Sequence, residues 1–575
     1  MSGQSNRRKR GPSALSTETI MIWTGLGVVG ALLAGTWIPL HLAAALADAP
    51  APPANPFTIL IYLATGHLTW TTAATVALAV LAAILVCLAL AAAWALRRWR
   101  TRRTRVDASA THLGRGRDLT TLTEAGATAT AQRLGVTDSP GVPIGRTIAG
   151  KEMLYGSWED MHVDVWGPRT GKTTSRAVPA IMAAPGAVLV TSNKRDIVDA
   201  TRGPRSEKGT VWPFDPQQVA LEDPTWYWDP LSYVTDEVKA AQLAEHFASG
   251  SRDASARSDA YFDGEGRNLL ANLFLAAALD QRPITGVYTW LTRPTDDTAV
   301  HILADHGFPL QADGLSGIIE APDKQRAGVF GTAMQMANCL TNRRIAAWIT
   351  RQGPEDLRPR FDPHEFVRST GTLYSLSREG AGSAGPLVTA LTVAVVEAAE
   401  EMATTLAGGR LRTPLLGVLD EAANVCRWQR LPDLYSHYGS RGIVLMTILQ
   451  SWSQGVEVWG QEGMRKLWSA SNIKVYGGGV SETAFLQELS QLIGDYDRES
   501  ISANISKEGR STSHQLTSQA TLDVADLGAL PRGRAIVFAS GTPPTLVETV
   551  PWMRGPHAQA IKQSIADHEP GGVAP

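Results

Sequence analysis

Cysteine is the residue type that this 575-residue chain uses least, with three copies, Cys87, Cys339 and Cys426. None of them belongs to a CxxC pair, and no His/Cys spacing of the zinc-binding type accompanies them. The sequence therefore argues against a disulfide framework and a structural metal site, and it indicates a reducing compartment for the bulk of the chain.

An excess of one charge is also missing. The chain has 53 Lys and Arg residues against 55 Asp and Glu residues, which gives a formal net charge of −2. No global electrostatic footprint for nucleic acid exists, so any such binding must use a local patch or a pore. The length and the 44% hydrophobic composition are sufficient for roughly two to four folded units.

Two apolar stretches, residues 20–46 and 72–96, lack Lys, Arg and Glu, and each exceeds the about 20 residues that a membrane-spanning helix needs. Basic clusters precede the first stretch and follow the second, whereas the connecting segment 47–71 has no Lys or Arg. The positive-inside rule then predicts a two-span anchor in the cytoplasmic (inner) membrane, in contact with lipids, with both termini and the soluble bulk in the cytoplasm.

Two other interpretations of this region remain open. A cleaved signal peptide has three regions, and similar ones occur here in RRKR, the first apolar stretch and ALADAPA. Residues 20–46, however, exceed the usual 7 to 15 residues of a signal core. A buried helical hairpin is the second, but the arginine cluster after Leu96 is better suited to lipid headgroups.

The run MHVDVWGPRTGKTTS, from Met161 to Ser175, is the most informative stretch. An apolar strand that leads into a glycine-bounded loop ending in Gly-Lys-Thr is typical of nucleotide triphosphate binding, because the loop's N–H groups and its lysine surround the phosphates. The residues predicted to bind the nucleotide are Gly167, Pro168, Arg169, Thr170, Gly171, Lys172, Thr173 and Thr174. Lys172 would contact the β/γ oxygens, and the Thr173 hydroxyl would ligate Mg²⁺.

This loop departs from the usual spacing. Three residues separate Gly167 from Gly171 where four are usual, and strict counting places Trp166 at the position of the first glycine. Either the loop is one residue shorter or its turn begins in another register, and Pro168 also removes one N–H donor. The alternative interpretation is an ordinary strand-to-helix turn.

A pair of carboxylates ends a second apolar run, PLLGVLDEAANV. If this run is a parallel strand, Asp420 and Glu421 lie at its carboxyl edge, where open α/β sheets bind ligands. Asp420 would then hold Mg²⁺ and Glu421 would orient or deprotonate water. The next strand, residues 442–451, places Gln450 at the same edge as a sensor of the γ-phosphate, or simply as a solvated strand end. Arg441 begins that strand, where it could reach the nucleotide of a neighbouring subunit.

The remaining sequence predicts a divided domain. Residues 1–19 form a basic N-terminus, 20–96 the anchor with a short extracytoplasmic loop, and 97–150 a cytoplasmic linker that ends in turns at 135–150. Strand signals place an ATPase-like α/β domain at 151–238 and 349–555, interrupted by an all-helical insertion at 239–348. A Ser-rich loop or hairpin occupies 500–518, and 556–575 form a tail.

Together, the apolar spans, GPRTGKTT, AVLVTSNKRDI, WYWDPLSYV, VLDEAAN and ILQSWSQ resemble the TraG/TraD-like coupling-protein ATPases of type IV secretion and conjugation. This resemblance implies a RecA-like P-loop NTPase fold with an all-helical insertion, preceded by two transmembrane helices. It also implies ATP and Mg²⁺ as ligands, catalytic roles for Lys172, Glu421 and Gln450, metal ligation by Thr173 and Asp420, and a homo-hexamer. The implied partners are a relaxase-bound DNA strand or secreted proteins, and components of the secretion channel.

Two features depart from that pattern: the short loop, and Ser192-Asn193 at a position that is usually acidic. An FtsK-like DNA translocase is one alternative, although the tail after Met553 is too short for a winged-helix DNA reader. A membrane-tethered receptor that holds nucleotide without hydrolysing it is the other; the short loop favours it and the Asp420–Glu421 pair argues against it.

Overall fold

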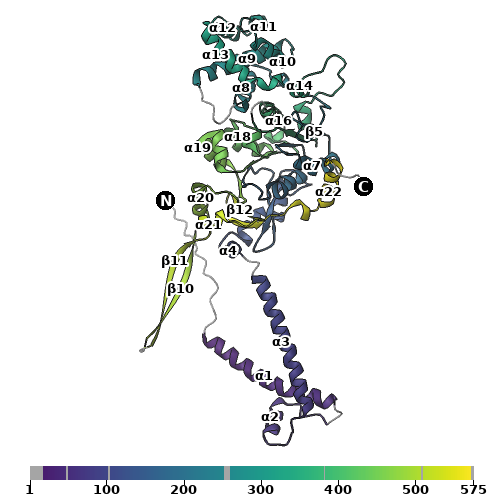
Figure 1. Ribbon diagram of the computed structural model, residues 1–575, viewed down its shortest axis with the longest axis vertical. Coiled ribbons are helices and arrows are strands. Elements are labelled where there is room, and N and C mark those ends of the chain that lie inside the picture. Colours follow the sequence, from purple (N-terminus) through teal and green to yellow (C-terminus); the bar gives the residue numbers. More distant parts are fainter. Residues whose placement is uncertain are drawn as a thin grey trace. The chain divides into compact units, whose positions relative to one another are not determined.

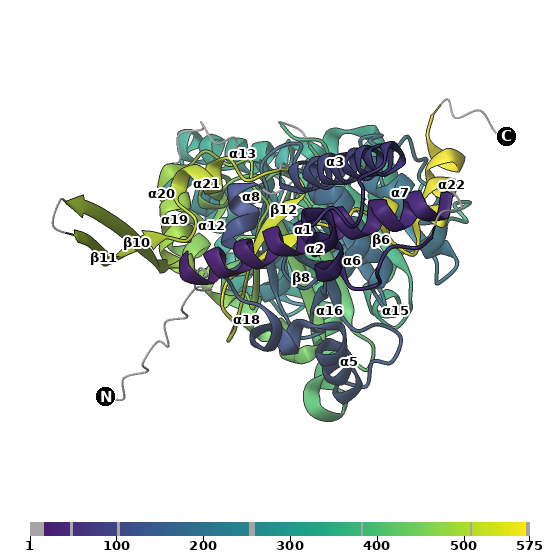
Figure 2. The same cartoon turned by 90° about the horizontal axis from the view of Figure 1, so that it is seen from below.

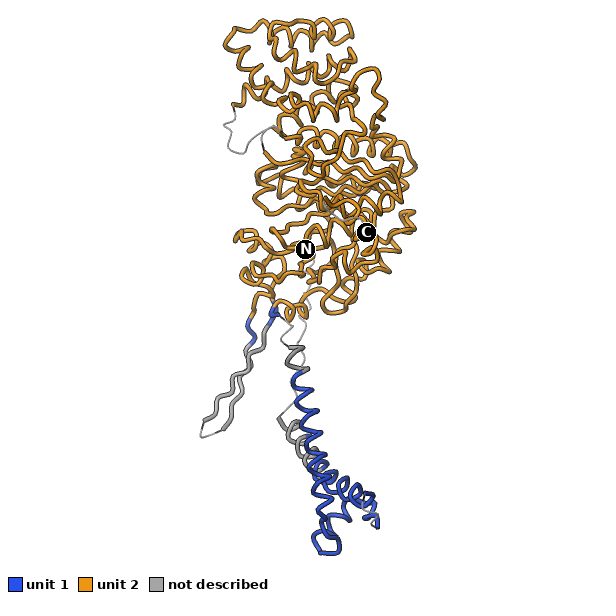
Figure 3. The backbone as a smooth tube through the Cα atoms, turned by 45° about the vertical axis from the view of Figure 1, so that its right-hand side comes forward, with its two compact units in different colours: residues 1–105, 496–517 blue, residues 106–495, 518–575 orange. Residues whose placement is uncertain are grey.

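The computed structural model describes residues 17–46, 50–100, 104–251, 259–380, 383–506 and 509–570. The chain divides into two compact units, coloured separately in Figure 3. Unit 1 comprises the described parts of residues 1–105 and 496–517, and unit 2 those of residues 106–495 and 518–575. Each unit is considered by itself.

Unit 1 contains three apolar helices, α1 (Thr17–Leu46), α2 (Pro56–Ala64) and α3 (Thr72–Arg100). The Asn55 side chain caps α2 by accepting a hydrogen bond from the backbone N–H of Phe57 at 3.0 Å. The residues buried where the three helices meet are Leu40, Ala43, Ile59 and Ala74. In α1 this small cluster uses Leu40 and Ala43, which lie near the C-terminal end of the helix.

Within the described residues, one helical segment, Thr72–Trp94, is long and apolar enough to cross a membrane, and few of its side chains are buried. The apolar part of α1 that meets the same composition is shorter, Gly30–Leu46. The first of the two predicted spans is therefore not confirmed by length, and it remains a prediction.

A long two-stranded hairpin, β10 (Asp495–Ser506) with β11 (Gly509–Ala520), covers the Ser-rich segment for which a loop or a hairpin was predicted. Figure 2 shows it as a separate ribbon. Its two strands pair with each other and, among the described strands, with no other.

The centre of unit 2 is a sheet of eleven described strands, in the order β2-β1-β13-β12-β9-β3-β8-β7-β4-β6-β5. The strands from β9 to β5 are parallel, and they are β9 (Ile473–Tyr476), β3 (His162–Val165), β8 (Ile443–Leu449), β7 (Leu415–Leu419), β4 (Val188–Ser192), β6 (Thr372–Leu376) and β5 (Val211–Phe214). Their carboxyl ends therefore meet at one edge, as the predicted α/β fold requires.

Both faces of the parallel strands are covered, which explains why these strands are continuously apolar rather than alternating. In β4, Val188 and Val190 belong to one buried cluster, while Leu189 belongs to the other. On one face lies α16 (Gly385–Thr404), whose residues are almost all buried. The sequence predicts this helix at 386–407, one residue from its observed start and three residues from its observed end.

The antiparallel end of the sheet differs from the sequence prediction. Residues 135–150 were expected to form turns, but β1 (Val142–Thr147) lies there, paired with β2 (Met153–Gly156) and with β13 (Thr545–Glu548). A Pro and a Gly inside β1 hide the strand pattern. A Cβ at Gly145 would lie 2.9 Å from the Glu548 carbonyl oxygen, so the glycine permits the close pairing.

Helices fill the described residues between β5 and β6, as predicted for the insertion. They are α8 (Glu237–Ser251), α9 (Ala260–Leu279), α10 (Thr285–Leu291), α11 (Thr298–Asp305), α12 (Pro309–Ile319), α13 (Asp323–Met336) and α14 (Arg343–Ile349), followed by α15 (Pro363–Val367). Figure 1 shows α9 to α13 grouped together in teal. In this group α9 packs against α8, α11 and α13, so its side chains form the centre of the helical part.

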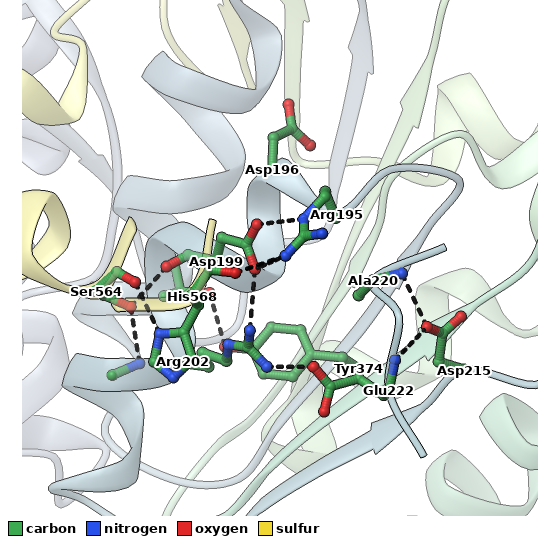
Figure 4. Close-up of polar contacts among 12 residues, drawn as sticks. Arg195, Asp196, Asp199, Arg202, Asp215, Ala220, Glu222, Tyr374, Ser564 and His568 are labelled. Carbon is green, nitrogen blue, oxygen red and sulfur yellow. Dashed lines mark hydrogen bonds and ion pairs between the residues drawn. The ribbon is translucent and has the colours of Figure 1, made fainter. Parts of the chain in front are cut away.

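The C-terminal helix α22 (Ala558–His568) packs on α7 (Asp196–Ser206), the helix that follows β4 (Figures 1 and 2). Figure 4 shows the polar contacts between them. The Ser564 hydroxyl donates to the carbonyl of Asp199 at 2.6 Å and accepts from the N–H of Gly203 at 3.0 Å. The region predicted as a tail is therefore attached to the α/β part by specific hydrogen bonds.

Candidate nucleotide site

The phosphate-loop motif begins where β3 ends, and β3 is the middle strand of the sheet of eleven described strands. Trp166 follows the last residue of β3 and continues its pairing with β8, because the Trp166 N–H donates to the carbonyl of Leu449 at 2.9 Å. The chain turns at Gly167, whose N–H donates to Gly478 at 2.8 Å, and a Cβ at Gly167 would lie 1.9 Å from the carbonyl oxygen of Gly479. Of the two sequence alternatives, the structure therefore shows a shorter loop that starts at Gly167.

Left-handed backbone shapes the rest of the loop. Arg169 has φ +59° and Gly171 has φ +93°, and the side chains of Thr170 and Thr174 bond back to the carbonyls of Gly167 and Gly171 at 2.5 and 3.1 Å. Side-chain hydroxyls of this loop thus stabilise its own turns.

The helix after the loop was predicted over 173–184. Its first turn, Thr173–Ala177, is π-helical, and α6 (Val178–Ala183) continues it. Single π-helical turns are often found at functional sites. Arg176 lies in this wider first turn and forms a fully buried ion pair with Asp164 of β3 at 2.7 Å. The ion pair attaches the turn to the strand.

The two predicted carboxylates follow β7 at the same edge of the sheet. Asp420 and Glu421 are each 2% exposed. Glu421 has φ +56° and ψ +42°, a left-handed conformation that costs a residue with a Cβ about 1–3 kcal/mol. Such strain is found at functional sites, where the surrounding structure holds the residue in place.

The predicted lysine meets both carboxylates. The Nζ of Lys172 lies 3.2 Å from Asp420 Oδ1 and donates a short hydrogen bond to Glu421 Oε1. Gln450, after β8, donates from Nε2 to the same Glu421 oxygen at 2.6 Å. Lys172 and Gln450, which are 278 positions apart in the sequence, therefore converge on one carboxylate pair.

The electrostatics of this cluster follow from its burial. Burial raises the pKa of Asp420 to about 6, although the ammonium of Lys172 opposes the shift and the neighbouring Glu421 carboxylate adds to it. Burial by itself would lower the pKa of Lys172, but the two carboxylates outweigh it, so the pKa of the lysine is raised and the side chain is charged.

The side chains present suit a magnesium–nucleotide complex. A carboxylate and a hydroxyl are oxygen ligands of the kind that Mg²⁺ prefers, and the half-buried Thr173 and the Asp420 side chain would supply them. Lys172 is already charged and directed at this edge, and Pro168 and Arg169 are exposed. No group of three or more His, Cys, Asp or Glu residues that could hold a metal ion occurs among the described residues.

Arg441 lies at the far edge of the sheet, at the start of β8, as its sequence position predicts. It forms an ion pair with Glu400 of α16 at 3.1 Å. It does not take part in the Lys172 cluster of its own chain.

The sequence analysis assigned no role to three polar residues at the site: Glu379 and Asn424, which it did not single out, and Asn193, which it noted as a departure from a usually acidic position. Glu379, after β6, accepts hydrogen bonds from Asn193, after β4, at 2.7 Å and from Asn424 at 2.8 Å. Asn424 also donates to Glu421 Oε2 at 3.5 Å. Each of the three follows a buried strand. Gln450 was selected because it is a polar residue at the carboxyl end of an apolar strand, and the same rule applied to residues 370–379 would have selected Glu379.

Part of the chain matches a known protein family. Residues 414–532, which include Asp420, Glu421 and Gln450, match the family model described as the TraM recognition site of TraD and TraG. None of the curated proteins compared with the chain matches it significantly.

Solved structures of a bacterial conjugative coupling protein, TrwB, share the fold. The unbound TrwBdeltaN70 structure aligns with TM-score 0.52 and 17% identity over 73% of this chain and 91% of that one. The complex of TrwB with the non-hydrolysable GTP analogue GDPNP aligns with TM-score 0.51, 17% identity and coverage of 73% and 92%. The complex with ADP and Mg²⁺ has TM-score 0.51, 16% identity and the same coverage.

At these identities the structural match establishes the fold alone, an α/β fold with a helical part that the chain shares with TrwB. Together with the family match over residues 414–532, it confirms the predicted resemblance: the chain is similar to the TraG/TraD-like coupling proteins of type IV secretion.

Proposed function

We propose that the protein is a membrane-anchored ATPase that recruits DNA, as a relaxase-bound strand, or protein substrates and drives them into a type IV secretion channel. The observation that supports this most directly is the convergence of Lys172, Asp420, Glu421 and Gln450 at one edge of the sheet. ATP and Mg²⁺ are the proposed ligands, and a homo-hexamer is the proposed working assembly.

The roles follow from the charges at the site. Bound Mg²⁺ would neutralise the phosphate oxygens and stabilise the charge that develops during transfer. Lys172 would exchange its contact with Glu421 for a contact with the β/γ-phosphates, and Thr173 and Asp420 would hold the metal. Release from Lys172 would leave Glu421 free to accept a proton from the attacking water, while Gln450 keeps the carboxylate oriented.

The comparisons support the ligand and the class of partner. TrwB, which shares the fold, has been solved with a GTP analogue and with ADP and Mg²⁺. The matched family model is described as a recognition site for TraM, which supports partners that belong to a conjugation complex. The apolar α1 and α3 support the proposed two-span anchor, with lipid contacts and both termini in the cytoplasm.

ATP hydrolysis by the full chain in lipid nanodiscs tests this proposal. We expect Mg²⁺-dependent phosphate release from the wild type and at least a hundredfold loss of kcat for both Lys172→Ala and Glu421→Gln. Glu421→Gln should still bind a fluorescent ATP analogue, because the amide removes the base without removing the lysine. Lys172→Ala should lose that binding.

Lys324→Ala and Glu462→Gln are matched controls, since both side chains are exposed and far from β7 in the sequence. Equal activity of Lys172→Ala and wild type would contradict the proposal. Confirmed ATP binding without phosphate release by the wild type, with DNA and membrane present, would favour the non-hydrolysing receptor. Stimulation by double-stranded DNA without any relaxase would favour the FtsK-like alternative.

A further inference from the structure

The carboxylate of Glu379 lies between two asparagine amides at the edge of the sheet. Its Oε1 accepts from Asn193 Nδ2 at 2.7 Å and from Asn424 Nδ2 at 2.8 Å. These three residues come from the segments that follow β4, β6 and β7. One carboxylate thus connects the ends of three neighbouring strands.

Asn424 carries this connection to the proposed base. An amide nitrogen has two N–H donors, and those of Asn424 face Glu379 at 2.8 Å and Glu421 Oε2 at 3.5 Å. Glu421 Oε1 is held separately by Lys172 and Gln450. Both oxygens of Glu421 are therefore oriented, and Oε2 depends on a side chain that Glu379 orients in turn.

The segment that carries Glu379 is fixed at its base. Gln217 Oε1 accepts hydrogen bonds from the Ser377 hydroxyl at 2.9 Å, the Arg378 N–H at 2.9 Å and the Ala384 N–H at 3.0 Å. Glu379 therefore reaches the site from a segment with three hydrogen bonds at its ends, although its own side chain is exposed.

The backbone explains why such support matters. Glu421 is in a left-handed conformation, which is unfavourable for a residue with a Cβ. Contacts with the surrounding structure are therefore needed to hold it. Once Lys172 turns to phosphate, the Oε1 hydrogen bond from Gln450 and the Oε2 contact from Asn424 are what remains to hold the carboxylate.

We propose that Glu379 and Asn424 are positioning residues for the proposed hydrolysis: Glu379 orients the Asn424 amide, and the amide sets the direction of the Glu421 carboxylate toward the attacking water. This inference rests on the proposed function. It predicts an effect on the chemical step and not on nucleotide binding, because neither residue is part of the phosphate loop.

Steady-state ATP hydrolysis by full-chain variants in nanodiscs tests the inference. We expect Glu379→Ala and Asn424→Leu to lower kcat by about 10- to 100-fold, a typical consequence of a misplaced reacting group, with KM for ATP within twofold of wild type. Glu379→Gln is the decisive variant, because its amide oxygen still accepts from both asparagines. It should retain at least half of the wild-type kcat.

Glu365→Gln and Glu365→Ala form the matched control pair, since Glu365 is exposed and bonded to Arg368 away from the strand ends. Wild-type kcat in Glu379→Ala, an equal loss in Glu379→Gln and Glu379→Ala, or a rise in KM that accounts for the whole loss would each overturn the inference. These outcomes need an active wild type, so they are distinct from failure of the proposed function, in which wild type itself releases no phosphate.

Discussion

At the scale of single residues, buried charges are concentrated beneath the phosphate loop. The Arg176 and Asp164 side chains are fully buried and form a bidentate pair, and Arg176 also lies 3.3 Å from the Nδ1 of His162. Burial and the nearby guanidinium keep the pKa of His162 well below its usual value, so the imidazole is neutral. The strand before the loop and the helix after it are therefore joined by one paired charge.

Breaking this pair should be costly. We expect Arg176→Met to lower the free energy of unfolding by about 3–5 kcal/mol, because Asp164 would be left buried and unpaired. The double variant Arg176→Met/Asp164→Leu should be less destabilised than the single variant, since it buries no charge. Denaturant unfolding of the detergent-solubilised chain measures both, and a double variant at least as unstable as the single one would contradict this explanation.

His246 on α8 predicts a pH dependence. Burial, and secondarily the positive charge of Arg430, lowers the pKa of His246 to about 3, and neither ring nitrogen has a hydrogen-bond partner among the described residues. The unfolded chain binds a proton at this histidine below about pH 6.5 but the folded chain does not, so wild type loses stability as the pH falls from 6.5 toward 3.

Between pH 8 and pH 5, we expect His246→Phe to lose about 2 kcal/mol less of its free energy of unfolding than wild type. The difference in Tm between pH 8 and pH 5 should shrink in this variant, whereas the exposed His437→Phe should keep the wild-type difference. An unchanged difference in His246→Phe would show that the histidine is protonated in the folded state.

At the scale of elements, the phosphate loop depends on the glycine loop after β9. Gly479 has φ +77°, and a Cβ there would lie 2.6 Å from Thr170 Cγ2 and 3.2 Å from Gly167 Cα. The two loops thus approach each other closely enough that each limits the other's conformation. The short phosphate loop is supported from the neighbouring strand.

Gly479→Ala should therefore raise the Kd for a fluorescent ATP analogue at least tenfold, because the methyl group must displace Thr170 from the loop. Gly408→Ala is the matched control: Gly408 has the same φ of +77°, but a Cβ there meets nothing within 4 Å. Titration of a fluorescent ATP analogue measures the effect. Equal weakening by both substitutions would mean that general destabilisation, and not loop contact, is responsible.

At the scale of the whole molecule, the proposed two-span anchor would determine on which side of the membrane the α/β fold lies. If both apolar segments span the membrane, the Pro-rich stretch between α1 and α2 lies outside the cytoplasm. The parts of the chain before the first span and after the second then lie inside. We expect a cysteine at Ala51, in a chain whose three native cysteines are replaced, to react with an impermeant maleimide in intact cells. Ser206→Cys, at the exposed last residue of α7, should react only after lysis.

The reverse labelling pattern would contradict the two-span topology. Loss of the N-terminal residues from the mature protein, measured by intact mass, would instead support the signal-peptide alternative. Labelling of neither position before lysis would support a buried helical hairpin.

Much of this architecture was predictable from the sequence because it depends on local chemistry. The continuous apolar runs gave the parallel strands, since strands covered on both faces need no polar residues, and Gly-Lys-Thr and Asp420–Glu421 marked the strand ends where ligands bind. Their order along the chain also carried the family resemblance. The Gly- and Pro-containing β1 was missed, because its pairing with β13 at the other end of the chain has no local signal.

Only the tertiary structure decided how the strand ends face one another. Parallel pairing places β3, β8, β7, β4 and β6 side by side, and this order brings Lys172, Gln450, Glu421, Asn193 and Glu379 to one edge although they are scattered over 278 positions. The register of the phosphate loop was likewise set by its contact with Gly478 and Gly479, in the loop that follows β9. Residue types follow from local sequence, whereas a shared hydrogen bond requires the whole sheet to form.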